Sequence, residues 1–188
     1  MTSTLTELNA QAATESLQRI AADLSMITDK KLVIEAPSVD CAHKRPAGQH
    51  QIHISFKLGF QRGREISHGT FLLPLTESIA LAGWLMMLTD DIVAAKRGQT
   101  TLDSGTKDAL LEIGNFVAGA CEAALRSIGS ADVKVRSEGC QGVRANVRPA
   151  LNYEDGSELV VAFAKARLEN GAPFDVILVL PPFAPAAL

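Results

Sequence analysis

Residues 106–128 have the pattern of one long, two-sided α-helix. Each residue of an α-helix turns by about 100°, so residues three and four apart share a face. Six residues fall within roughly 40° of one polar line: Asp108, Glu112, Asn115, Gly119, Glu122 and Arg126. The opposite side is apolar: Leu110, Ile113, Val117, Cys121, Ala124 and Ile128. Such a helix needs a second layer, so we expect the apolar side to pack on a sheet and the polar stripe to face outwards.

Both ends of this helix carry suitable residues. Ser104 or Thr106 can cap the N-terminus with a side-chain oxygen, and Asp108 then lies near the first turn, where the helix dipole favours an acid. Gly129 stands where the last turn usually ends in a left-handed backbone.

The remaining chain divides into further helices and strands. Leucine and isoleucine spacing predicts an N-terminal helix over about residues 4–27, and Thr76 can cap another over 77–88. The polar stretch 89–105 has room for a turn or two of helix. Runs rich in β-branched and aromatic residues predict strands: 31–39, 51–60, 69–75, VKVRS, GVRANVRP, SELVVAFAKARLE and FDVILVL.

This order of helix, strands, paired helices and strands predicts an α+β fold, with an antiparallel-rich sheet packed with two long helices. The 188 residues fit a single domain over 1–188, because a split would leave two marginal cores. Apolar residues make up 47% and charged residues 21% of the chain, which is typical of a globular protein.

Charge and hydropathy argue against two classes of partner. The formal net charge of −3 supplies no basic field for nucleic acid. The most apolar stretch, FLLPLTESIALAGWLMML, is interrupted by Pro74, Glu77 and Ser78, so we interpret it as core and not as a membrane span. The N-terminus lacks a basic start followed by an apolar run, so we expect a cytoplasmic protein.

No metal site is predicted. Three cysteines (Cys41, Cys121 and Cys140) are widely spaced and form no CxxC pair, which argues against a disulfide framework and a thiolate metal cage. The four histidines lie in one third of the chain, but His50 and His53 would point to opposite faces of a strand. Structural or surface histidines are the better interpretation.

The candidate chemistry lies on the polar stripe of the 106–128 helix. Glu112 and Asn115 are three residues apart and therefore neighbours on one face. Gly119 lies one turn further, where a missing side chain lets another surface approach. An acid and an amide on an amphipathic helix are usually only solvated, so this pair needs support from the flanking sequence.

That support comes from TLDSGTKDALLEIGNFVAGACEAALRSIG, which resembles the phosphatase helix of the CheC/CheX/FliY chemotaxis family, most of all that of CheX. Upstream, GTFLLPL entering TESIALAGWLMML resembles the strand and helix that precede it in the family. The chain departs from the family pattern at Glu138, where a proline is usual, and at Ala120, where CheX-like members often have a second asparagine.

The resemblance implies a CheC/CheX-like fold and a hydrolase that removes the aspartyl phosphate of a CheY-like response regulator in two-component signalling. Glu112 would pair with the receiver's lysine, Asn115 would hold the attacking water, and Asp108 and Gly119 would contact the partner. The resemblance also implies no cofactor of its own, Mg²⁺ on the partner receiver, and a homodimer. The alternative is a non-catalytic receiver-binding or flagellar-switch adaptor.

The preceding helix offers a weaker parallel. Glu77 is followed three residues later by Ala80, so a counterpart site there would lack the amide. We therefore expect one working site per chain.

Overall fold

The computed structural model describes residues 6–154 and 156–183 of the chain. Within these residues the helices are α1 (Glu7–Thr28), α2 (Leu75–Leu85), α3 (Asp90–Lys96) and α4 (Ser104–Ser127). The strands are β1 (Leu32–Ile34), β2 (Ser38–Ala42), β3 (His53–Arg62), β4 (Glu65–Pro74), β5 (Val133–Val143), β6 (Leu159–Leu168) and β7 (Phe174–Leu180).

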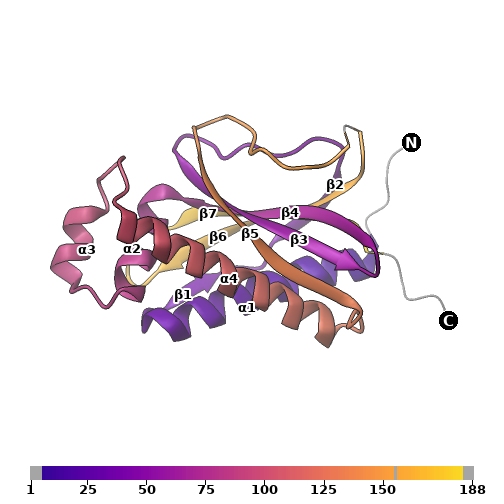
Figure 1. Ribbon diagram of the computed structural model, residues 1–188, viewed down its shortest axis with the longest axis horizontal. Coiled ribbons are helices and arrows are strands. Elements are labelled where there is room, and N and C mark those ends of the chain that lie inside the picture. The colour runs from indigo at the N-terminus through magenta and orange to yellow at the C-terminus, as the bar shows by residue number, and fades with distance from the viewer. Residues whose placement is uncertain (1–5, 155, 184–188) are drawn as a thin grey trace.

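The strands form one antiparallel sheet in the order β1-β6-β7-β4-β3-β5, and β2 also pairs with β6. Figure 1 shows the long helices α1 and α4 beneath the sheet, with α2 and α3 at one end. The predicted α+β fold, with an antiparallel sheet packed with two long helices, is therefore confirmed. None of the described helices is both long and apolar enough to cross a membrane.

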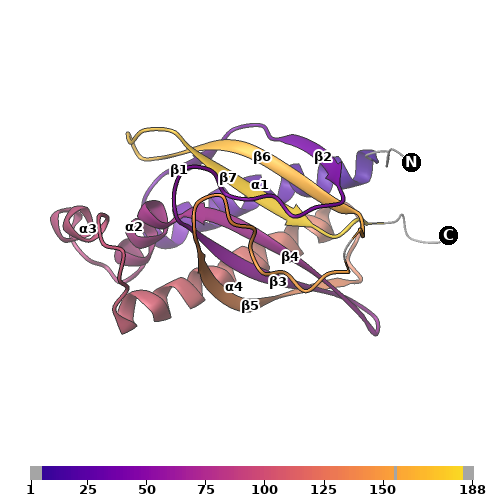
Figure 2. The ribbon, with the colours of Figure 1, turned by 90° about the horizontal axis from the view of Figure 1, so that it is seen from above.

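The two faces of the sheet are covered unequally. The main core lies between the sheet and the helices, where alternate residues of β3 (Phe56, Leu58 and Phe60) are buried because strand side chains alternate between faces. The opposite face holds a smaller apolar cluster around Leu72 and Val161. Residues 144–154, which we call the strap, cross this outer face (Figure 2) and pack Leu151 and Tyr153 onto it.

The strap corrects one predicted strand. We expected GVRANVRP (142–149) to form a strand of its own, but Gly142 and Val143 end β5 and the residues after them are irregular. Asn146 has φ 61°, a left-handed backbone that a strand does not contain. Pro149 adds a position without an N–H for pairing.

Other element boundaries also differ from the predictions. The single strand expected over 31–39 is divided into β1 and β2, and Pro37, which has no N–H to donate, lies between them. Helix α2 begins at Leu75 with Pro74 at its N-cap, so Thr76 lies inside the first turn and does not cap it. Helix α1 is described from Glu7, and the first residues of the expected 4–27 helix lie outside the described residues.

A β-bulge shapes the pairing of β3 with β5. Phe56 pairs with Cys140 and Leu58 pairs with Ser137, so Glu138 and Gly139 both lie opposite Lys57. Gly139 has φ 88°, a conformation that a residue without Cβ adopts without strain. Glu138, the position at which the sequence departs from the pattern it resembles, is therefore the first residue of a bulge.

Candidate functional site

The N-terminus of α4 is fixed by Asp103 and not by the residues we predicted. Its carboxylate accepts a hydrogen bond from the Thr106 N–H at 2.7 Å and pairs with Lys96. These contacts, that with Lys96 first, hold the pKa of Asp103 well below its usual range. Ser104 and Thr106 are thus helical, and Asp108 lies one residue beyond the first turn, where the helix dipole is a weaker reason for an acid.

The other end of α4 is fastened to β5 by Glu122. Its carboxylate accepts from the Val135 N–H at 3.0 Å and lies 3.3 Å from Lys134 and 2.9 Å from Arg126. The Val135 N–H is the main reason that the pKa of Glu122 is lowered. Glu122 was expected on the outward stripe, but its side chain is only 23% exposed because it reaches back to the strand. It is an anchor of the helix.

A glycine sets how closely α4 approaches the sheet. A Cβ added at Gly114 would lie 2.9 Å from Ser137 Oγ and 3.5 Å from Phe56 Cδ1. A side chain there would collide with β5, so Gly114 lets the backbone of α4 come close to the strand. We did not predict this role, because glycine also occurs on exposed helix faces and its spacing alone does not say what it faces.

Glu112 and Asn115 are both exposed on the outer side of α4. Asn115 Nδ2 donates to Glu112 Oε2 at 3.3 Å, a long hydrogen bond that holds the two groups side by side. Among the described residues, no second hydrogen bond or ion pair joins either side chain to another element. Both polar groups are therefore available to an incoming molecule.

Asp108 and Gly119 lie on the same exposed face. A Cβ added at Gly119 would meet nothing within 4 Å, so this glycine opens the surface instead of relieving a contact. The structure thus brings Asp108, Glu112, Asn115 and Gly119 onto one solvent-facing line of a well-anchored helix.

Two exposed apolar side chains flank this line. Leu111 is 46% exposed and Phe116 is 36% exposed, one on each side of Glu112 and Asn115 around the helix. We did not single them out in the sequence. Two large apolar residues outside the apolar stripe of an amphipathic helix were the available signal, since such residues commonly mark contact surfaces.

The counterpart position on α2 is occupied differently. The Glu77 carboxylate pairs with Arg97, and Ala80 is fully buried. An acid held by a cation and a small residue facing the core present no reactive pair.

The histidines serve separate contacts. His53 is buried with its Nδ1 2.8 Å from the Gln51 carbonyl oxygen, and this burial lowers its pKa. His68 Nδ1 lies 2.8 Å from Glu138 Oε2. Within residues 6–154 and 156–183, no three His, Cys, Asp or Glu side chains gather in the manner of a metal site.

Comparison of the sequence with models of protein families and with curated proteins gives no match. Comparison with solved structures does. FliY of Thermotoga maritima superposes with a TM-score of 0.70 at 14% identity, covering 95% of this chain and 92% of that one. CheX of Desulfovibrio desulfuricans superposes with a TM-score of 0.55 at 15% identity, covering 89% of this chain and 97% of that one.

The FliM middle domain of H. pylori is a third neighbour, with a TM-score of 0.61 at 8% identity and 94% coverage of both chains. At such identities the likeness concerns the fold, and it supports the resemblance found in the sequence at that level. The chain has the fold shared by FliY, CheX and CheC-like chemotaxis proteins and by the FliM middle domain.

Proposed function

We propose that this protein hydrolyses the aspartyl phosphate of a CheY-like response regulator, with Glu112 orienting the receiver and Asn115 positioning the attacking water. One observation carries the proposal: the two side chains lie together, exposed and without further partners among the described residues, on a helix held at both ends.

The chemistry suits these two residue types. Phosphoryl transfer passes through a loose transition state, so positioning contributes more than covalent help. The Asn115 amide can hold a water in line without adding negative charge beside the phosphoryl oxygens. The Glu112 carboxylate can pair with a lysine of the receiver. Mg²⁺ belongs to the receiver in this proposal, and the protein needs no cofactor of its own.

The surroundings of the pair suit a protein substrate. Leu111 and Phe116 supply exposed apolar area on both sides of the polar line, and Gly119 leaves clearance one turn away. Interface centres typically combine apolar anchors with a few polar contacts. We therefore assign Leu111 and Phe116 to receiver binding and Asn115 to the hydrolytic step.

The second candidate is a non-catalytic adaptor in a flagellar switch. It is favoured by the FliM neighbours, one of which was solved as a FliG–FliM complex with a TM-score of 0.62 at 10% identity. The same exposed face could then bind a receiver or a switch protein without turnover. The two candidates differ in whether the bound receiver loses its phosphate faster.

Decay of a phosphorylated receiver separates the two candidates. Across a panel of CheY-like receivers, we expect the wild type to accelerate the decay of its cognate receiver. Asn115→Ala should lose about a hundredfold of this acceleration, as when one transition-state hydrogen bond is removed. Glu112→Ala should lose a similar amount of the acceleration. Leu111→Ala should raise the receiver concentration needed for half-maximal rate more than it lowers the maximal rate.

Arg126→Ala is the matched control, because it lies on the same stripe but belongs to the Glu122 anchor. An unchanged decay rate for every receiver would remove the phosphatase proposal, and binding without acceleration would support the adaptor. Pairing of two copies, which the resemblance implies, remains a prediction that sedimentation of the full chain tests.

A further inference from the structure

The outer face of the sheet holds a polar hollow whose lining includes neither Glu112 nor Asn115. Its volume is about 470 Å³, which is within the usual range for small-molecule sites. Five chain segments each contribute one polar side chain to it: Arg45, Lys57, His68, Glu138 and Asn152. We call it the outer hollow. The strap lies over it, and the bulge of β5 forms one wall.

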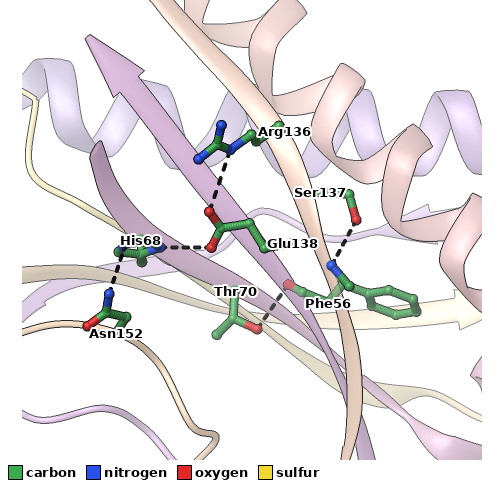
Figure 3. Close-up of polar contacts among 8 residues, drawn as sticks. Phe56, His68, Thr70, Arg136, Ser137, Glu138 and Asn152 are labelled. Atoms are coloured by element: carbon green, nitrogen blue, oxygen red, sulfur yellow. Dashed lines mark hydrogen bonds and ion pairs between the residues drawn. The ribbon is translucent and has the colours of Figure 1, made fainter. Parts of the chain in front are cut away.

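Glu138 already has two partners on its own wall. His68 Nδ1 lies 2.8 Å from one carboxylate oxygen and Arg136 Nε lies 3.6 Å from the other, as Figure 3 shows. Gly59 makes room for this arrangement, because an added Cβ would lie 2.9 Å from Glu138 Cδ. The carboxylate therefore contributes lone pairs to the hollow, while Arg136 offsets part of its charge.

The charge that remains unmatched in the outer hollow is positive. Among the described residues, the Lys57 ammonium has no carboxylate partner. Arg45 Nη1 donates to the Pro149 carbonyl at 2.9 Å and its guanidinium lies over the Tyr153 ring, and neither contact neutralises it. Arg45 Nε is buried without a hydrogen-bond partner in the described structure, which is a costly state for a donor.

A neighbouring hollow differs in charge. It has about 480 Å³ and lies on the other side of the His68–Asn152 contact, where the two nitrogens are 3.4 Å apart. Glu154 and Glu158 line it, so it presents acids where the outer hollow presents cations. An anionic ligand is therefore directed to the outer hollow.

We propose that the outer hollow binds a small organic anion, whose carboxylate or phosphate group is held by Lys57 and Arg45 and whose hydroxyl group donates to Glu138. Hydrogen bonds between charged groups are the strong ones, so an oxyanion between the Lys57 ammonium and the Arg45 guanidinium is the ligand group that this hollow favours. On the side of the strap, Asn152 borders the outer hollow and contacts His68 (Figure 3).

Isothermal titration calorimetry of the full chain with L-malate and glycerol 3-phosphate tests the proposal and separates the two oxyanion classes. We expect saturable binding of at least one probe, weakened about tenfold or more by Lys57→Gln. Lys165→Gln is the matched control, because it removes an exposed lysine from the same sheet face outside the hollow. It should change the dissociation constant by less than about twofold.

Succinate, which lacks the hydroxyl, should bind more weakly than malate. Asn115→Ala should bind the probes like the wild type, so failure of the phosphatase proposal leaves this one standing. No saturable binding of either probe would overturn the proposal, as would equal weakening by Lys57→Gln and Lys165→Gln. Equal affinity for succinate and malate would overturn the role of Glu138.

Discussion

Helices α2 and α4 each carry a glutamate followed by a glycine six or seven residues later, yet the two helices place these residues in opposite environments. On α2, Glu77 is tied to Arg97 and Ala80 is buried, so the helix is committed to the core. On α4, Glu112 and Asn115 are exposed and touch each other. The difference teaches that sequence spacing defines a candidate site only after each residue has a known environment.

The largest expected effect comes from introducing into α2 the asparagine that α4 carries three residues after its glutamate. Ala80→Asn places a larger, polar side chain at a fully buried position, so we expect about 3 kcal/mol of destabilisation and no new phosphatase activity. Urea denaturation measures the loss. Ala22→Asn, at an exposed position of α1, is the control and should cost well under about 1 kcal/mol. Equal losses for both variants would contradict the contrast.

The two glutamates should differ in their contribution to stability. Glu77→Gln breaks an ion pair in which the carboxylate is 13% exposed, and we expect a loss of about 1 to 2 kcal/mol. Glu112→Gln should change the free energy of unfolding by less than about 0.5 kcal/mol, because its side chain is exposed. Chemical denaturation of both variants decides the point, and a larger loss at Glu112 would reverse the comparison.

The two glycines should respond to alanine with opposite signs. At Gly119 an added Cβ meets nothing, so Gly119→Ala should stabilise the protein by about 0.5 to 1 kcal/mol through helix propensity. At Gly83 of α2 the same atom would lie 2.8 Å from Val93 Cγ2, so Gly83→Ala should destabilise it. Thermal unfolding of the two variants provides the measurement, and shifts of the same sign would count against the assigned surroundings.

The smallest effect is a pH dependence at Glu122, the anchored acid of α4. Its pKa in the folded protein lies below the ordinary value of 4.5, so its contribution to stability is complete above that value and is lost as pH falls through the folded pKa. At neutral pH the free energy of unfolding of the wild type should be larger than that of Glu122→Gln by about 0.5 kcal/mol. Denaturation at about pH 3 should show a smaller difference in the free energy of unfolding between the two proteins. A difference that does not change with pH would assign the effect to packing.

Much of the fold could be predicted from periodicity. The apolar line predicted for residues 106–128 corresponds to the buried residues of α4, because the burial of one face imposes this repeat. The left-handed Gly129 was also expected, and it has φ 88°. The failures are of another kind. The bulge at Glu138 depends on the pairing of β5 with β3, which no local pattern encodes, whereas Pro149 was a local signal against the strand expected over 142–149.

The candidate site was partly predictable for the same reason. A 3.6-residue repeat places Glu112, Asn115 and Gly119 on one exposed face, as the structure has them. The repeat could not distinguish Glu122, whose partner Val135 N–H comes from a strand thirteen residues away. Asp103 was missed because several neighbouring residues can cap a helix, and packing selects among them.

The close contact at Gly114 determines how precisely α4 is positioned relative to the sheet. A helix that rests on a strand through long side chains can rise or sink as those side chains change rotamer. At Gly114 the backbone of α4 lies against Ser137 and Phe56 with no side chain of its own between them. The distance of Asn115, the next residue, from the sheet is therefore fixed by the position of β5 and does not vary with side-chain rotamers.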